Sequence, residues 1–196
     1  MKTKLDFSDY PDIVNGDIFW RPPSERLKAI PYLYERSASC LNFLFRISDY
    51  TSREGYPPEM HAAAQIRAAL VEFVGIEEAV QSAGYEFKIM SLPSPLLHFM
   101  RLLRNYQIHI GSHSISKKSI DVIFAGQETS IEVSVIDNLH PDKFMQLAAI
   151  AKYGSYNPSD IQVMIELFNT QQTRLGVYEI LRIGAQRLIT EAEKVF

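Results

Sequence analysis

The sequence has little cysteine and no long apolar run. Its single cysteine, Cys40, cannot form an internal disulfide, and it excludes a zinc site built from several thiolates. No run of about 18 apolar residues is present, so the sequence predicts no membrane-spanning helix. The first residues, MKTKLDFSDYPDIVNGD, lack the apolar segment of a signal peptide. We therefore expect a cytoplasmic protein in a reducing compartment, with no membrane partner.

Acidic residues are absent from residues 87–120, although the whole chain has a net charge of −3. This window carries a charge of +5, so the rest of the chain must carry −8, and it also contains three of the five histidines. A positive patch on an acidic body is typical of a phosphate-binding site on a soluble protein. The alternative is a helix end and a turn that both happen to be basic. The lysines and arginines of the window are Lys88, Arg101, Arg104, Lys117 and Lys118.

The chain divides into an irregular arm, residues 1–23, and a single helical domain, residues 24–196. Ser24 is a suitable N-cap for a first short helix, because its hydroxyl can accept from a free backbone N–H. Pro31 is expected to break that helix, because proline lacks the N–H that a helix interior needs. Apolar residues at helical spacing then predict a helix over residues 32–50.

Two further helices and a hairpin are predicted in the middle of the chain. Pro58 suits the first turn of an alanine-rich helix that ends at Gly84, and a third helix precedes Gly111. After it the period changes from helical to alternating. The segment SIDVIFAGQETSIEVSVI, at about residues 119–136, therefore predicts a β-hairpin.

The C-terminal part reads as helical again. A short helix is expected to start at Pro141, and a long one at Asn157, with proline next and an acid in its first turn. The long helix is expected to reach Phe196, with a bend near Gly176. The predicted fold class is all-α: an up-and-down bundle of four to five helices with an inserted β-hairpin.

The third helix carries polar residues beside its apolar face. On a helical wheel, Phe99, Leu102, Leu103, Tyr106 and Ile110 form a core face about 100° wide. A polar stripe about 80° wide adjoins that face and contains His98, Arg101, Asn105 and His109.

Arg104 lies outside this stripe, roughly 140° from His109 on the wheel. The two side chains are therefore not simple neighbours on the helix surface. They can meet through the length of the arginine, through distortion of the helix end near Gly111, or across a second copy of the helix.

The pattern Arg104-Asn105-x3-His109 resembles the Arg-polar-x4–6-His signature of the HEPN superfamily, which comprises nucleotide-binding and RNA-cleaving helical bundles. In that family the residue after the arginine is commonly Asn, Asp or His, and the motif lies near the C-terminal end of a bundle helix. The resemblance is close over the motif helix and loose over residues 24–196. The hairpin is not part of the family's minimal bundle, so it reads as an insertion.

The resemblance implies metal-independent cleavage of single-stranded RNA at a site assembled from two protomers, with no cofactor and no metal. It gives His109 the role of general base or acid, Arg104 that of phosphate clamp, and Asn105 that of orienting the imidazole or the substrate. The chemistry is consistent, since a neutral-pH base can deprotonate the 2′-OH and a guanidinium can stabilise the phosphorane.

Several further residues are candidates for holding the RNA backbone. They lie in the same acid-free window and are His98, Arg101, His113, Lys117 and Lys118. Members of the family often act as toxins or in phage defence, which implies an antitoxin protein as a further partner.

Two alternatives to the ribonuclease remain open. In one, the protein is a non-catalytic helical module whose polar stripe binds a nucleotide or a protein partner. In the other, the bundle is purely structural, Arg104 pairs with Glu72, Glu77 or Glu78 on the preceding helix, and His109 is covered. His98 and Arg101 taken singly are better explained as structural residues, and Tyr106 as a core residue.

Overall fold

The computed structural model describes residues 4–10, 21–45, 57–109, 115–124, 126–147 and 156–196. For Asp9, Ile108, His109 and Phe124 the description covers the backbone alone. The described part is mostly helical with one antiparallel hairpin, as the sequence predicts. Its α-helices are α1 Leu33–Leu44, α2 Pro58–Ser82, α3 Pro95–His109, α4 Pro141–Met145, α6 Pro158–Leu175 and α7 Val177–Glu193.

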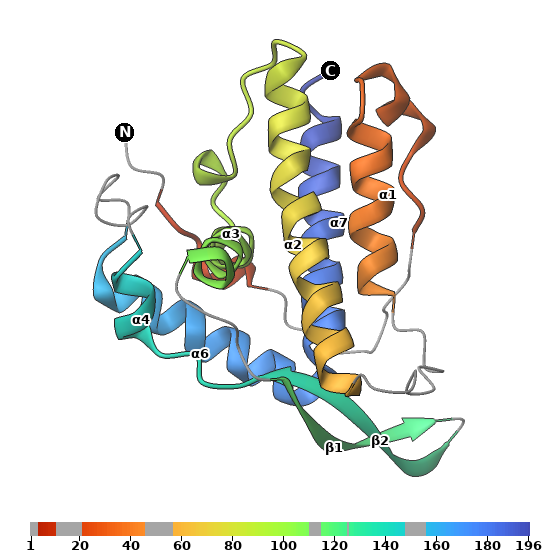
Figure 1. Cartoon of the computed structure of the whole chain (residues 1–196), viewed down its shortest axis with the longest axis vertical. Helices are drawn as coiled ribbons and strands as arrows, with labels where there is room; N and C mark the ends of the chain where they lie inside the picture. Colours follow the sequence, from red (N-terminus) through yellow and green to blue (C-terminus); the bar gives the residue numbers. More distant parts are fainter. Residues whose placement is uncertain (1–3, 11–20, 46–56, 110–114, 125, 148–155) are drawn as a thin grey trace.

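The helices form an upright group and a crosswise group. In Figure 1, α1, α2 and α7 run side by side, and all three pairs are in contact. Helix α3 is seen end-on in the same view, so it crosses the upright helices, and α6 runs across below it with α4 alongside. Helix α3 contacts α2, α4, α6 and α7. The helix that carries the Arg104-Asn105-x3-His109 motif therefore packs against helices of both groups.

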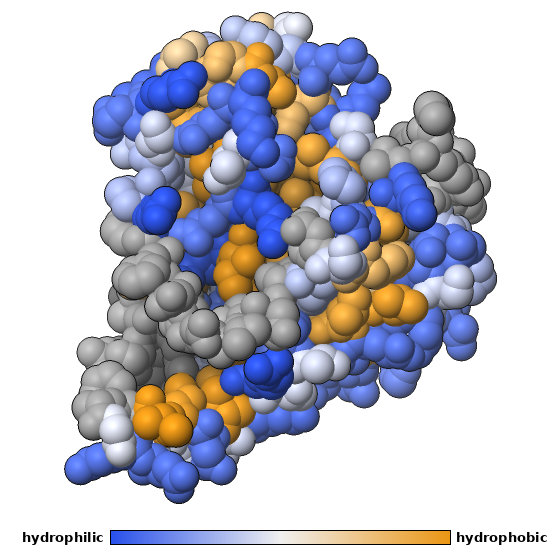
Figure 2. Space-filling view, turned by 180° about the vertical axis from the view of Figure 1, so that it is seen from behind, coloured by the Kyte–Doolittle hydropathy of each residue, from blue (hydrophilic) through white to orange (hydrophobic). Residues whose placement is uncertain are grey.

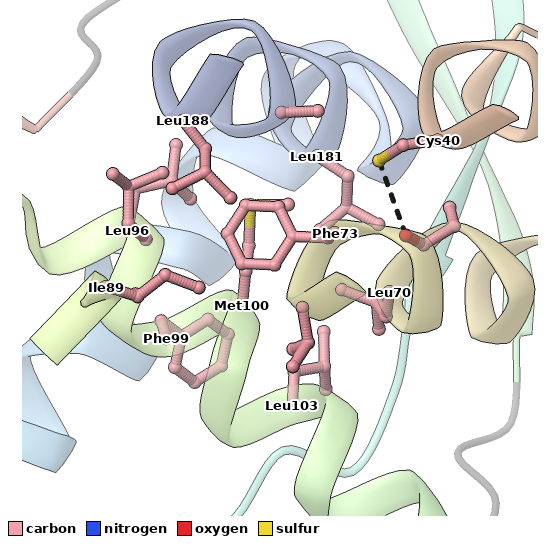
Figure 3. Packing of buried hydrophobic residues seen from close by; sticks show 14 of the residues in the cluster. Cys40, Leu70, Phe73, Ile89, Leu96, Phe99, Met100, Leu103, Leu181 and Leu188 are labelled. Atoms are coloured by element: carbon pink, nitrogen blue, oxygen red, sulfur yellow. Dashed lines mark hydrogen bonds between the residues drawn. The ribbon is translucent and has the colours of Figure 1, made fainter. Parts of the chain in front are cut away.

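The core lies where these helices meet. Figure 3 shows Phe73 of α2 and Met100 of α3 pointing toward Leu181 and Leu188 of α7. All four are completely or almost completely buried. A Cβ at Gly184 of α7 would overlap the sulfur of Met100, so this glycine allows the crossing helix to approach α7 closely.

Cys40 is buried on α1 and faces α2. Its thiol donates a hydrogen bond to the carbonyl of Ala69 at 3.3 Å. Burial raises the pKa of the thiol, so it stays protonated and acts as a small packed side chain, as the sequence suggests.

The described part of the predicted arm contains a short helix and contacts the helical domain. Short 3-10 helices form at Phe7–Asp9 and Glu25–Ala29, and a third, Ile89–Ser91, follows α2. The amide of Asp6 donates to the carbonyl of Pro93 at 2.9 Å, and Tyr10 is buried. The described part of the arm is thus packed onto the domain that it was expected to precede.

Helix α1 starts and ends at different residues from those predicted. The hydroxyl of Ser24 accepts from the amide of Arg26 at 3.3 Å, as expected of a cap, but the turn that follows is a 3-10 helix. The α-helix starts after Pro31 and ends at Leu44, and the rest of the predicted segment, residues 46–50, lies outside the described residues.

The predicted hairpin is present and longer than expected. Strand β1, Ile115–Phe124, pairs antiparallel with β2, Gln127–Ile136. The last pair, Phe124 with Gln127, leaves a two-residue turn, and Gly126 in it has a φ of 81°. In Figure 1 the hairpin projects below the bundle. Its base is buried and its outer half is exposed.

The long C-terminal helix was predicted as one bent helix that reaches Phe196, whereas the structure has two helices, of which the second ends at Glu193. The start is as expected, with a capping box between Asn157 and Asp160 and Pro158 in the first turn. The bend near Gly176 is a complete break into α6 and α7. Gly176 adopts a φ of 84°, and a Cβ there would collide with Val133 of the hairpin. Glycine alone tolerates both conditions.

Candidate functional site

Helix α3 holds the predicted site, and its buried face fixes how the helix is rotated. Phe99, Leu102, Leu103 and Tyr106 are all buried, which confirms the predicted core face as far as it is described. Ile110, the fifth residue of that face, lies outside the described residues. The ring of Tyr106 stacks on Phe144 of α4, with centroids 4.8 Å apart, which confirms Tyr106 as a core residue.

Arg104 is half-buried, and its guanidinium is held by its neighbour. Nη1 of Arg104 donates to Oδ1 of Asn105 at 3.1 Å. Nε of Arg104 is buried and has no hydrogen-bond partner among the described residues. No carboxylate within the described ranges forms an ion pair with it. The positive charge of this arginine is therefore not neutralised by the part of the chain that the structure describes.

The acidic partners suggested for Arg104 are placed elsewhere. Glu72 binds Arg36 of α1, with Nη1 and Oε2 3.1 Å apart. Glu77 binds Arg101, and Glu78 lines a small surface cavity beside Arg36. The purely structural alternative, in which one of these glutamates neutralises Arg104, is not what the geometry favours.

Arg101 is the counter-ion of a buried carboxylate. Its Nη1 donates to both oxygens of Glu77, at 2.9 and 2.8 Å. Glu77 is only 4% exposed, and it also accepts from the amide of Ile89 at 3.0 Å. Removing Arg101 would leave a buried charge without its partner. This geometry favours a structural role for Arg101 over the predicted contact with RNA.

His98 is 2% exposed, and both ring nitrogens are occupied. Nε2 lies 2.7 Å from the carbonyl of Leu92, and Nδ1 lies 2.8 Å from the hydroxyl of Tyr156. A carbonyl only accepts, so Nε2 carries the proton. Nδ1 faces the hydroxyl of Tyr156, which also lies 3.0 Å from the sulfur of Met90. Burial lowers the pKa of His98. The ring is therefore neutral and internal, which favours a structural role for it too.

The two hairpin lysines are exposed, but one is paired. Lys117 lies 3.2 Å from Glu132 across the hairpin, and Lys118 is exposed beside it. Both follow the end of α3 after only a few residues. His113, which lies between them and α3, is outside the described residues, and of His109 only the helical backbone is described.

The described residues thus bring together Arg104 and Asn105, whereas Arg101 and His98 are engaged in the interior. Sequence reasoning did not single out Gln107, whose buried Oε1 has no partner among the described residues. It lies three positions after Arg104, on a neighbouring part of the helix surface. The spacing of three residues between Arg104 and Gln107 could have indicated that the two side chains are neighbours. Gln107 was overlooked because glutamine carries no charge.

No group of three or more His, Cys, Asp or Glu side chains within the described ranges is arranged to hold a metal ion. The helices of those ranges are also too short or too polar to cross a membrane. Comparisons of the chain with models of protein families, with curated proteins and with solved structures find no match.

Proposed function

We propose that the protein is a metal-independent endoribonuclease of the HEPN type that cuts single-stranded RNA. The observation that supports this most is the state of Arg104. Its guanidinium is positioned by Asn105 at the C-terminal part of a bundle helix and has no acidic partner among the described residues. Arg36, Arg101 and Arg182 are each paired with a glutamate. A positioned arginine that is not neutralised is suited to bind a phosphate.

In the proposed reaction His109 removes the proton from a ribose 2′-OH. The freed oxygen attacks the adjacent phosphorus and forms a new P–O2′ bond. The P–O5′ bond breaks, and the leaving oxygen takes up a proton from the protonated imidazole or from water. Arg104 binds the non-bridging oxygens and stabilises the extra negative charge of the transition state. The products are a 2′,3′-cyclic phosphate and a 5′-hydroxyl.

The role proposed for Asn105 is more specific than the resemblance alone suggests. Its side-chain oxygen already accepts from Arg104, so we assign it the task of holding the guanidinium in place. The amide nitrogen of Asn105 is then the group that remains to face the substrate or the imidazole. Because it acts through Arg104, Asn105 is a positioning residue.

We further propose that the working enzyme is a homodimer in which a second copy of α3 completes the site. The rotation of roughly 140° between positions 104 and 109 on the helix supports this, because one straight helix does not direct both side chains to one point. An antitoxin that covers the site is the partner that a toxin of this type would need.

The experiment is incubation of single-stranded RNA with the protein in excess EDTA, followed by separation of the fragments. The unmodified protein is expected to cut, and Arg104→Ala and His109→Ala are each expected to abolish cutting. Arg67→Ala is the matched control, because Arg67 is an exposed arginine on α2 and should leave the rate unchanged. Cutting that survives both substitutions would overturn the proposal. Nucleotide binding without any cutting would support the non-catalytic module instead.

A further inference from the structure

The base of the hairpin reveals which backbone groups face outward. The side-chain amide of Gln172 on α6 accepts from the amide of Ile136 and donates to its carbonyl, both at 2.8 Å. Gln172 thus occupies the place of a neighbouring strand, so the backbone groups of Ile136 point away from β1. In an antiparallel ladder these directions alternate along each strand. Every second residue from Ile115, the partner of Ile136, therefore points its backbone groups away from β2.

The outer edge of β1 is open over most of its length. Its outward-facing residues are Ile115, Lys117, Ser119, Asp121 and Ile123. Among the described residues no backbone group outside the hairpin bonds to any of the five. Ile115 is buried at the base, whereas the others are exposed, and Ile123 is 76% exposed. Such an edge is a template for another strand.

The surface around this edge is also partly apolar. Figure 2 shows an apolar patch on the hairpin, at the lower left of the view, with hydrophilic side chains below it. Ile131 of β2 is 42% exposed, and Ile120 and Val122 of β1 are half-buried. An exposed, partly apolar two-stranded ribbon is poorly stabilised alone and gains from additional strands.

The order of the five outward-facing residues is symmetric in chemistry about Ser119. An isoleucine stands at each end, and a lysine on one side is matched by an aspartate on the other. Two such strands that pair antiparallel with Ser119 opposite Ser119 place Lys117 opposite Asp121, twice, and Ile115 opposite Ile123, twice. Opposite charges and apolar pairs facing each other are the stabilising cross-strand combinations.

We propose that β1 is a dimerisation edge that pairs with β1 of a second copy of this chain, in this register, to form a four-stranded sheet. The contact is isologous, since each residue meets the partner that its symmetry mate also meets. It provides the exposed Ile123 with an apolar neighbour and gives Asp121 a cationic one, Lys117, which Asp121 then shares with Glu132 of the same hairpin as Lys117.

Strand β2 does not offer an equivalent edge. Its outward-facing residues include Glu128 and Glu132, and its ten residues contain no lysine or arginine. Pairing β2 with itself therefore gathers four carboxylates with no opposite charge. At the base of β2, the backbone amide and carbonyl of Ile136 are already hydrogen-bonded to Gln172, so they cannot pair with another strand.

Pairing of the hairpins is independent of the proposed ribonuclease function. With Ser119 opposite Ser119, the two Ile115 residues lie eight residues apart along the sheet, which is about 26 Å at 3.3 Å per residue. Because α3 ends shortly before Ile115, the hairpin contact does not itself bring the two α3 ends together. If the hairpins do not pair, the ribonuclease proposal is unaffected. If the protein does not cleave RNA, the proposal of hairpin pairing is unaffected.

The test combines charge reversal with cross-linking in the full chain. By sedimentation velocity over a concentration series, the unmodified protein should self-associate through this contact, in addition to any pairing of the α3 helices. Lys117→Asp and Asp121→Lys should each weaken it at least tenfold, because each places like charges opposite one another. The double variant restores the opposite charges in exchanged order and should recover dimerisation. Glu128→Lys on β2 is the control and should leave the dimer unchanged.

Cross-linking tests the register. Ser119→Cys should form a disulfide-linked dimer under mild oxidation, because directly opposite strand residues lie within disulfide range. Ser130→Cys is a matched control, because Ser119 and Ser130 share one hydrogen bond of 2.6 Å, so both variants lose the same contact. Cys40 is buried and does not compete. A monomer at every concentration, a dimer indifferent to both charge reversals, or cross-linking through Ser130→Cys instead would overturn the proposal.

Discussion

The side-chain oxygen of Asn105 accepts a hydrogen bond from its immediate neighbour, Arg104, at 3.1 Å. Consecutive residues on a helix do not normally face each other, so it is the length of the arginine side chain that allows this contact. The guanidinium is thereby held in one place without being neutralised. This is the arrangement that a phosphate-binding arginine needs, because a carboxylate partner would compete with the phosphate.

Asn105→Ala is expected to slow RNA cleavage about tenfold while changing the free energy of unfolding by no more than about 1 kcal/mol, because it removes one partly exposed hydrogen bond. Arg104→Ala should abolish cleavage altogether. The measurement is a rate at saturating RNA together with a urea unfolding curve for each variant. An Asn105→Ala protein that cleaves at the normal rate would show that the contact does not position Arg104 for the reaction.

Replacing Arg101 with methionine should destabilise the fold by about 3 kcal/mol, because Glu77 would be left buried without its counter-ion. Adding Glu77→Met should recover most of that loss, since the double variant has no unpaired buried charge at these two positions. Urea unfolding of the three variants gives the coupling between the two positions. The same proteins should still cleave RNA if Arg101 is structural. Loss of cleavage in a well-folded double variant would instead indicate that Arg101 contacts the RNA, as the sequence predicts.

His98 should make the stability of the protein depend on pH. Burial lowers its pKa in the folded state, so the unfolded chain, with its ordinary value near 6.5, binds the proton first. The contribution of the neutral ring is fully present above that value. It is lost as the pH falls below about 6.5 toward the lowered folded pKa.

The comparison with His98→Gln isolates this effect from the other histidines, because glutamine keeps a donor and an acceptor but does not titrate in this range. Between pH 7.5 and pH 5, the midpoint temperature of thermal unfolding should fall more steeply for the unmodified protein than for the variant. If the midpoint temperature depends on pH in the same way in the two proteins, the ring is not buried in neutral form.

Gln172 should be important for the attachment of the hairpin. Gln172→Met keeps the size of the side chain but leaves the amide and carbonyl of Ile136 unpaired in a buried place, so a loss of about 2–3 kcal/mol is expected. Gln171→Met is the matched control, because Gln171 is similarly buried and its Oε1 has no partner among the described residues. Amide exchange at Ile136 should accelerate in the first variant only, and equal acceleration in both would contradict this assignment.

Local sequence signals were sufficient for most of the fold. The Asn157-Pro158 start of α6, the proline at the start of α2 and the alternating pattern of the hairpin strands all follow from short-range chemistry. The break at Gly176 was foreseen only as a bend, because its cause is tertiary: Val133 of the hairpin leaves no room for a Cβ at that position.

The candidate site was harder to predict for the same reason. A helical wheel places His98 and Arg101 on a polar stripe, but it does not reveal that Tyr156 and Glu77 approach from distant segments and bind them. It also separates Asn105 from Arg104, although the length of the arginine allows the two to meet. The wheel gives the direction of a Cβ atom, whereas the partners of long polar side chains depend on what packs around them.

The central claim is that this protein breaks RNA by attack of the 2′-OH without a metal ion. The most direct measurement uses a DNA oligonucleotide that contains a single ribonucleotide, incubated with the protein in excess EDTA, with the product ends identified by mass spectrometry. We predict one cut, directly 3′ of the ribonucleotide, which leaves a 2′,3′-cyclic phosphate and a 5′-hydroxyl and is absent with Arg104→Ala. Cleavage at deoxyribonucleotides, a 5′-phosphate end, or equal cutting by Arg104→Ala would contradict the claim.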